Sequence, residues 1–171
     1  YATTTSLRSA SRNMYDGSTA GPSVTDQFEA GIKTSWFNDR FRANFNYFNM
    51  NEENLSFEVY ENQTATGLYE FAGNMRRQGV EVEISGRPLP NVQVLLGYSY
   101  TDAGYQNSPV YMNGSRPMNS PYNTANAWVQ YKFQNTQSFV DGLTASIGWY
   151  YIGSRPVNDF ALSNDGHGNY G

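Results

Sequence analysis

The chain alternates apolar and polar residues with a period of two over much of its length. Residues 92–100 are the clearest case, because every second side chain, from Val92 to Tyr100, is apolar and lies on one side of an extended chain. Residues 79–85 show the same pattern, with two glutamates on the opposite side. Pro88 and Pro90, which lack backbone donors, separate the two stretches. The pattern predicts a β-hairpin.

About five further stretches show this period, which gives about seven strands in all. They are residues 1–7, 26–36, 41–48, 124–133 and 143–151. The connections between the stretches are alternately short and long. The short ones lie near residues 37–40, 86–91 and 134–142, and the long ones near 8–25, 51–69, 104–122 and 154–171. The sequence therefore predicts an all-β, antiparallel sheet whose long connections all lie at one end.

The apolar face of the six better strands contains no Lys, Arg, Asp or Glu. A Lys or Arg on the lipid side of a membrane barrel costs about 2–4 kcal/mol at mid-bilayer, so a face without charges favours lipid over a protein core as its neighbour. Short turns at one end and long loops at the other are typical of outer-membrane barrels. A soluble all-β binding module with one elaborated end stays open as the alternative.

Composition agrees with a surface that does not all face water. Aromatic residues make up 16% of the chain, and charged residues only 15%, against about 25% in ordinary globular proteins. The net charge of −4 argues against a nucleic-acid partner. No apolar run reaches the roughly 18 residues of a membrane-spanning helix. The first residues do not resemble a signal peptide, so we expect it to have been removed or the true N-terminus to lie elsewhere.

No catalytic constellation is present, and we do not expect an enzyme or a cofactor. The chain has no Cys and one His, and no Ser stands in a strand-to-helix nucleophile elbow. His167 could be imagined as a metal ligand with Asp165 and Asn169. A single His in a Gly-rich loop is more often solvated, so no metal site is expected.

Five segments, in order, resemble the C-terminal part of the barrel of TonB-dependent outer-membrane receptors, especially siderophore receptors. The segments are EAGIK (29–33), AGNMRRQGVEVEISG (72–86), YSYTDAG (98–104), SPYNTANAWVQYKF (120–133) and GLTASIGWYYIGSRP (142–156). Two departures are mild: Gln78 follows Arg77 where the family often has a Ser–Lys or Ser–Gln pair, and Asn123 stands where the family often has His.

The resemblance implies a transmembrane antiparallel barrel of roughly 22 strands in the bacterial outer membrane. Residues 1–171 would form part of that one barrel domain, at roughly the fourteenth to twentieth strands, with the plug domain and the last strands outside this sequence. The implied function is active import of a scarce chelate, and the resemblance to siderophore receptors implies a ferric siderophore; a glycan or cobalamin is the alternative cargo. The implied partners are outer-membrane lipid, the TonB energy-coupling protein acting through the plug, the chelate, and a lipoprotein or larger membrane assembly.

Two groups of candidate site residues follow. The long connections are the better place for recognition, and their ligand-contact candidates are Tyr105, Tyr111, Met112, Arg116 and Tyr122. The polar face supplies candidates that line the lumen or contact a plug, namely Glu29, Lys33, Arg42, Glu81 and Glu83. A barrel interior is also polar simply because it is wet, and that plain explanation stays open for the second group.

Overall fold

The computed structural model describes residues 2–8, 12–109, 111–134 and 139–157, in which every regular element is a β-strand. The main sheet consists of β1 (Ala2–Arg8), β4 (Ser23–Trp36), β5 (Phe41–Glu61), β6 (Thr64–Leu89), β7 (Val92–Gln106), β8 (Asn123–Lys132) and β9 (Thr144–Ile152). A small ribbon is formed by β2 (Arg12–Asn13) and β3 (Thr19–Ala20). In these residues no helix is long and apolar enough to cross a membrane.

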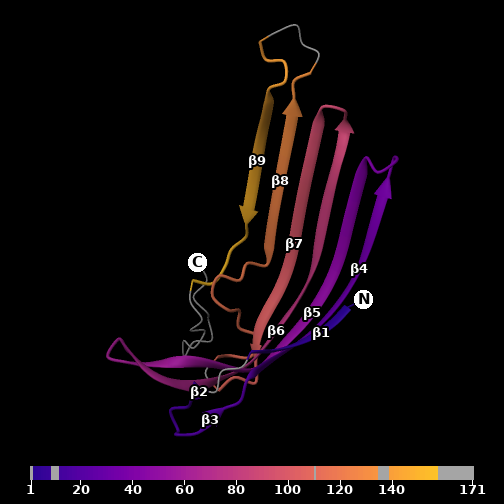
Figure 1. Cartoon of the computed structure of the whole chain (residues 1–171). Helices are drawn as coiled ribbons and strands as arrows, with labels where there is room; N and C mark the ends of the chain where they lie inside the picture. Colours follow the sequence, from indigo (N-terminus) through magenta and orange to yellow (C-terminus); the bar gives the residue numbers. More distant parts are fainter. Residues whose placement is uncertain (1, 9–11, 110, 135–138, 158–171) are drawn as a thin grey trace.

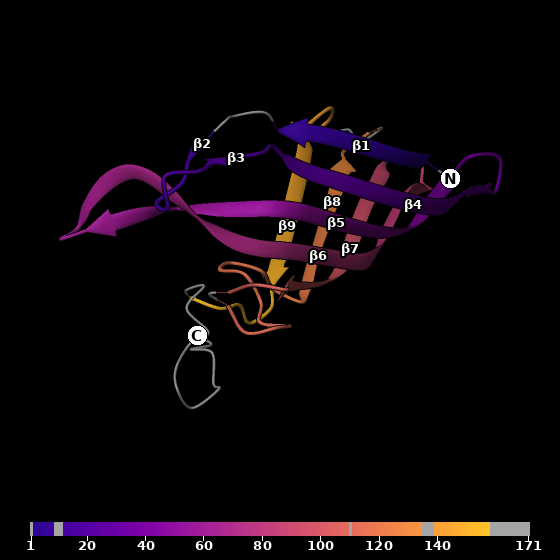
Figure 2. The ribbon, with the colours of Figure 1, turned by 90° about the horizontal axis from the view of Figure 1, so that it is seen from below.

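The 7-stranded sheet is an antiparallel meander with the strand order β1-β4-β5-β6-β7-β8-β9. This confirms the predicted antiparallel sheet and its strands. Figure 1 shows the turns between β4 and β5 and between β6 and β7 at one end, and the longer connections at the other. Seen from below, the strands turn progressively relative to one another, so the sheet is a twisted, curved arc (Figure 2). β1 and β9 are its two edges.

The prediction of a long connection over residues 51–69 was wrong. β5 and β6 continue through it as a hairpin extension, and only Asn62 and Gln63 form the turn. Both turn residues have positive φ, 49° and 65°, which matches the twist of two-residue hairpin turns. Register shifts near Leu55 and Tyr60 interrupt the alternation that would have identified these strands in the sequence.

The turn between β6 and β7 is shorter than predicted. β6 continues past Pro88 to Leu89, and Pro90 and Asn91 alone form the turn. The pairing is irregular between Gly86 and Leu89, so Pro88 lies in a bulge where no ladder donor is required.

Pairing registers place the predicted apolar residues side by side on one face, because directly opposed residues in an antiparallel pair share a face. Successive rows across β5, β6 and β7 are Phe41/Gly86/Val94, Ala43/Ile84/Leu96, Phe45/Val82/Tyr98 and Tyr47/Val80/Tyr100, preceded by Leu89/Val92 at the short-turn end. Their partners in β4, β8 and β9 are also uncharged. We call this surface the outward face.

The outward face is an apolar band of limited height. Five rows spaced two residues apart span about 27 Å along the strands, or about 21 Å after a tilt of about 40°, close to the roughly 25 Å band of outer-membrane barrels. The next rows bring Asn49, Gln78 and Asp102, and then Asn51 and Arg76, to the same side. The apolar residues remain exposed, as Ile32 at 69% and Ile147 at 73% show. The band therefore ends where the long-connection end begins.

Candidate functional site

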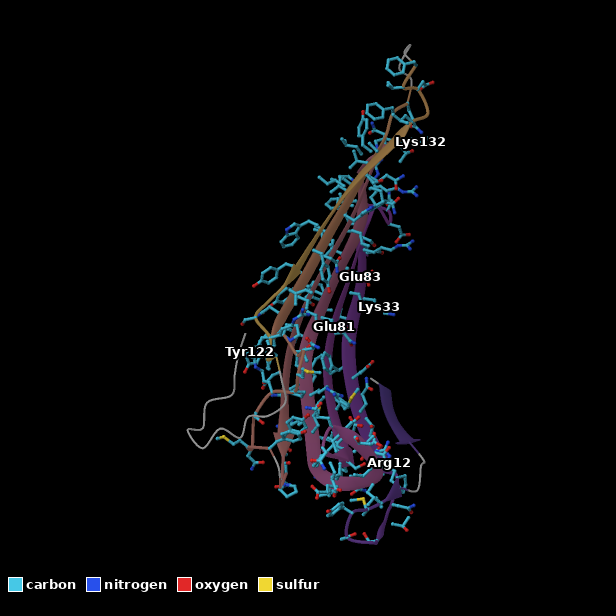
Figure 3. All side chains as sticks on the ribbon, turned by 90° about the vertical axis from the view of Figure 1, so that its left-hand side faces the viewer. Arg12, Lys33, Glu81, Glu83, Tyr122 and Lys132 are labelled. Carbon is cyan, nitrogen blue, oxygen red and sulfur yellow. The ribbon has the colours of Figure 1, made fainter. Side chains whose placement is uncertain are left out.

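The opposite surface, which we call the inward face, carries the predicted lumen-facing residues. Lys33, Asn44 and Glu83 are paired across β4, β5 and β6, and the neighbouring row pairs Gly31, Asn46 and Glu81. Figure 3 views the sheet nearly edge-on, with the labelled Lys33 and Tyr122 on opposite sides of it.

The other two predicted inward residues lie farther apart. Arg42 pairs with Ser35 and Ser85 toward the short turns. Glu29 lies toward the long connections, where its carboxylate accepts a hydrogen bond from the Gln27 amide. The structure thus gathers Lys33, Arg42 and Glu83 around one open hollow of about 450 Å³, and leaves Glu29 outside it.

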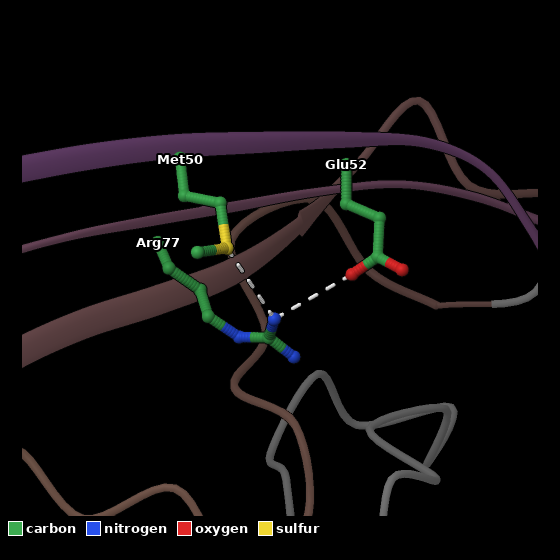
Figure 4. A network of polar contacts seen from close by, with 3 residues as sticks. All are labelled: Met50, Glu52 and Arg77. Carbon is green, nitrogen blue, oxygen red and sulfur yellow. Dashed lines mark hydrogen bonds and ion pairs between the residues drawn. The ribbon is translucent and has the colours of Figure 1, made fainter. Parts of the chain in front are cut away.

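At the long-connection end, β5 and β6 carry a polar contact that the sequence reasoning missed. The Arg77 guanidinium lies 3.5 Å from a Glu52 carboxylate oxygen and 4.0 Å from the Met50 sulfur (Figure 4). The side chain of Arg77 is 38% exposed and that of Glu52 is 15% exposed. This pair is therefore a partly screened surface ion pair, and it joins the two strands just beyond the apolar band.

The β2–β3 ribbon packs on the hairpin extension. Met14 forms a bridge with Tyr69 of β6, and the Tyr15 backbone N–H donates to the Tyr69 carbonyl at 2.8 Å. The Arg12 guanidinium donates to the Ser56 hydroxyl and lies 5.1 Å from the centre of the Tyr69 ring. The β2–β3 ribbon is therefore a structured layer on the hairpin extension of β5 and β6.

An exposed hydrogen bond also joins the β2–β3 ribbon to the hairpin extension. The Tyr15 hydroxyl donates to a Glu61 carboxylate oxygen at 3.0 Å. This hydrogen bond, together with the negative charge of Glu61, raises the pKa of Tyr15 above its ordinary value. In the ribbon's own turn, hydrogen bonds from the Ser18 hydroxyl and then from the Ser18 backbone N–H lower the pKa of Asp16.

The connection between β7 and β8 continues the backbone pairing of β7. β8 begins opposite Tyr100, and beyond that point residues 114–115 exchange backbone hydrogen bonds of 2.8 and 3.0 Å with Tyr105. The start of the connection lies against β6, because a Cβ at Gly73 would lie 2.6 Å from the Ser108 Cα. Gly73 also has φ +93°, so both its conformation and its surroundings require glycine.

The five predicted ligand-contact residues all lie in or beside this connection, and four of them form two separate pairs. Tyr105 stacks on Tyr111 with ring centres 4.1 Å apart. The Arg116 guanidinium lies 3.9 Å from the centre of the Tyr122 ring, which in turn stacks on Tyr100 of the outward face at 6.0 Å. Tyr122 therefore lies beside the outward face, away from the first pair.

Their exposure also differs. Tyr105 and Arg116 are buried, Tyr111 is half-buried, and Met112 and Tyr122 are exposed. In this conformation Tyr105 and Arg116 support the connection, while Tyr111 and Met112 remain accessible at its surface. The contacts of Arg12, Tyr69 and Arg77 were not foreseen because they join residues far apart in the chain, and no local pattern marks such pairs.

Among the described residues no three His, Asp or Glu side chains come together as metal ligands would. His167, Asp165 and Asn169 lie outside the described residues.

The whole chain, residues 1–171, matches the family model described as "TonB dependent receptor-like, beta-barrel". It is 26% identical to the ferrioxamine B receptor of Salmonella typhimurium over 137 residues, which cover 80% of this chain and 19% of that protein. It is 28% identical to the ferrichrome outer membrane transporter/phage receptor of Escherichia coli K12 over 152 residues, or 87% of this chain and 20% of that protein.

Solved structures share the fold. The ferric preacinetobactin receptor of Acinetobacter baumannii superposes with a TM-score of 0.71 at 19% identity, over 92% of this chain and 23% of that one. The ferripyoverdine receptor of the outer membrane of Pseudomonas aeruginosa gives 0.65 at 22% identity, over 90% of this chain and 20% of that one.

The chain thus spans about a fifth of the length of these relatives. Their names describe receptors and transporters. A complete family-model match, an apolar band of membrane height and an antiparallel meander agree with one another. The chain belongs to the TonB-dependent receptor family and is part of an outer-membrane β-barrel.

Proposed function

We propose that this stretch forms part of the wall of a TonB-dependent importer that carries a ferric siderophore across the bacterial outer membrane. The observation that carries the proposal is the family match over the whole chain together with relatives named for ferrioxamine, ferrichrome and ferric pyoverdine. An enzymatic activity is not part of the proposal, and neither is a resident cofactor, because the iron chelate is the cargo.

The two faces suit the two surroundings of such a wall. Lipid would cover the charge-free outward face, and the inward face, with Glu29, Lys33, Arg42, Glu81 and Glu83, would enclose a plug domain contributed by the same polypeptide. The TonB protein would act on that plug. The outward and inward assignments are supported by the register and by the exposure of the apolar rows.

Chelate recognition is proposed for the long-connection end. Tyr111 and Met112 offer partly apolar, aromatic and thioether surface, which can pack on a chelate, and the buried Tyr105 and Arg116 hold the connection that carries them. Tyr122 would stabilise the connection through Tyr100 and Arg116.

The test is growth of the source bacterium under iron limitation, with and without the gene. Purified ferric hydroxamate, ferric catecholate and mixed-ligand chelates are supplied one at a time. We expect deletion to abolish growth on one class alone, and deletion of the TonB protein to have the same effect. If deletion leaves iron uptake unchanged but removes uptake of a glycan or of cobalamin, the cargo assignment is wrong while the family assignment stands.

A further inference from the structure

The β7–β8 connection carries the one Asn-Gly dipeptide of this sequence, Asn113–Gly114. The side-chain amide of an asparagine reacts most readily when glycine follows it, because glycine has no Cβ to keep its backbone nitrogen away from the amide carbon. Asn113 is exposed, so water reaches it. The dipeptide therefore meets the chemical requirements of a spontaneous modification site.

The reaction needs only water. The Gly114 backbone nitrogen gives up its proton and attacks Cγ of Asn113. A new N–Cγ bond closes a succinimide ring, the bond from Cγ to the side-chain nitrogen breaks, and that nitrogen leaves with the proton as ammonia. Water then opens the ring at one of its two carbonyl carbons. One product is aspartate, and the other is isoaspartate, in which the main chain runs through the side-chain carbons.

The fold restrains both reacting groups. The Gly114 N–H donates to the Tyr105 carbonyl at 2.8 Å, and the Asn113 side-chain oxygen accepts a hydrogen bond from the Asn107 backbone N–H at 2.8 Å. The attacking nitrogen must give up a proton that a carbonyl holds, and the side-chain amide must leave its own partner. The connection must therefore open locally before the succinimide ring can close.

The same turn carries surface proposed for chelate recognition. The Ser115 N–H donates to the Met112 carbonyl at 3.0 Å, which closes the turn around the dipeptide. Tyr111 directly precedes the turn and stacks on Tyr105. A chemical change at position 113 therefore acts on the part of the connection that holds these side chains.

The two products differ in what they do to the connection. Aspartate at position 113 keeps an acceptor for the Asn107 N–H and strengthens it, because the accepting oxygen is then charged. Isoaspartate adds one atom to the main chain between Asn107 and Gly114. That extra atom displaces the Gly114 N–H from the Tyr105 carbonyl, so the backbone pairing with β7 cannot form again in its original register.

We propose that Asn113–Gly114 is a deamidation site that reacts only while the β7–β8 connection is open, and that isoaspartate at position 113 then keeps the connection open. Modification is therefore slow in the paired connection and irreversible once it has occurred. The inference concerns the connection alone and does not depend on the cargo of the receptor.

The test uses the full-length receptor in native outer membranes, incubated at neutral pH. Peptides that contain position 113 are followed over time by mass spectrometry, and fragmentation separates isoaspartate from aspartate. The same receptor unfolded in guanidinium gives the rate without restraint. We expect deamidation in the folded receptor to be slower by about tenfold or more, because only the open fraction reacts. Asn113→Gln, whose longer side chain disfavours ring closure, should give no product.

Variants at two glycines test whether opening of the connection sets the rate. A Cβ at Gly73 would lie 2.6 Å from the Ser108 Cα, whereas a Cβ at Gly67, which also has positive φ, would meet no atom within 4 Å. We expect Gly73→Ala to raise the deamidation rate by about threefold or more and Gly67→Ala to leave it unchanged. Heat-modifiable migration on gels will show that each variant contains an intact barrel.

Limited proteolysis tests the consequence. In aged receptor, molecules with isoaspartate at position 113 should be cleaved within residues 107–122 faster than unmodified molecules, and Asn113→Asp should be cleaved no faster than the unmodified receptor. Four results would each overturn the inference: equal rates in the folded and unfolded receptor, no product from either, equal rates in G73A and G67A, or equal cleavage of isoaspartate-containing and unmodified molecules.

Discussion

The membrane-spanning part of the sheet and its long-connection end are built differently, although the same strands run through both. Across the apolar band the pairing of β4, β5, β6 and β7 is continuous, and the only irregularity lies near the β6–β7 turn. At the long-connection end the pairing of β5 with β6 shifts repeatedly, and side chains pack on one another.

The distribution of buried residues shows the same difference. Of the five buried apolar residues in the described part of the chain, Ala72, Met75, Ala103 and Tyr105 lie at the long-connection end and only Ala43 lies in the band. The end that meets water builds a small core of its own. The band needs none, because lipid is the apolar phase for its side chains, and regular backbone pairing satisfies its polar groups.

The largest expected effect comes from a charge placed in the middle of the band. Leu96 is on the outward face, in the third of five rows, and the adjacent Leu95 is on the inward face. Leu96→Arg should cost about 2–4 kcal/mol of barrel stability. Leu95→Arg should be nearly neutral. Unfolding of the full receptor in lipid vesicles measures both, and equal losses would contradict the assignment of the two faces.

A smaller effect is expected where the β7–β8 connection meets β6. Gly73→Ala introduces strain at positive φ and a clash with Ser108, so it should destabilise this region by about 1–3 kcal/mol. Gly67, with φ +70° and no atom near its Cβ position, is the control for strain alone. Limited proteolysis should cleave residues 107–122 faster in G73A than in G67A. Equal cleavage would show that the contact does not hold the connection.

The ion pair between Arg77 and Glu52 should contribute less to stability than is lost in Leu96→Arg or in Gly73→Ala. Arg77 is partly exposed and therefore screened, so Glu52→Gln should cost no more than about 1 kcal/mol. Glu53→Gln, at the exposed neighbouring position, is the matched control. A double-mutant cycle with Arg77→Gln isolates the pair, and its coupling should shrink as salt is added. A coupling that salt leaves unchanged would indicate a buried pair.

The smallest effect is the pH dependence of the ribbon contact. The raised pKa of Tyr15 means that its protonated form is favoured in the folded state. The stability that the Tyr15–Glu61 hydrogen bond contributes is therefore complete below the ordinary tyrosine pKa. It is lost as the pH rises through the folded-state pKa, when a Tyr15 phenolate would repel Glu61. The protection of the Tyr15 amide against hydrogen exchange, relative to an unfolded amide at the same pH, should fall in that alkaline range. Tyr15→Phe should remove this pH-dependent fall.

Sequence and structure agree best inside the band and least beyond it. The strands around Val82 and Leu96 were predictable because one face must be apolar throughout and a slip of one residue would turn every side chain to the wrong side. The hairpin extension through residues 51–69 was not, because shifts in register near Leu55 break the period. The candidate residues Tyr105 and Arg116 were found as residue types of a recognition loop, but their burial was not foreseeable.

The sequence by itself determined the strands of the band, their two faces and the end that carries the long connections, because lipid imposes a strict period of two on every strand. Only the tertiary structure decided how that end is organised: Arg12 on Tyr69, Arg77 on Glu52, and the separation of Tyr105 from Tyr122. Only the structure brought Lys33, Arg42 and Glu83 around one hollow. The physical reason is that these contacts depend on strand register and on chain reversal between distant residues, which local sequence patterns do not encode.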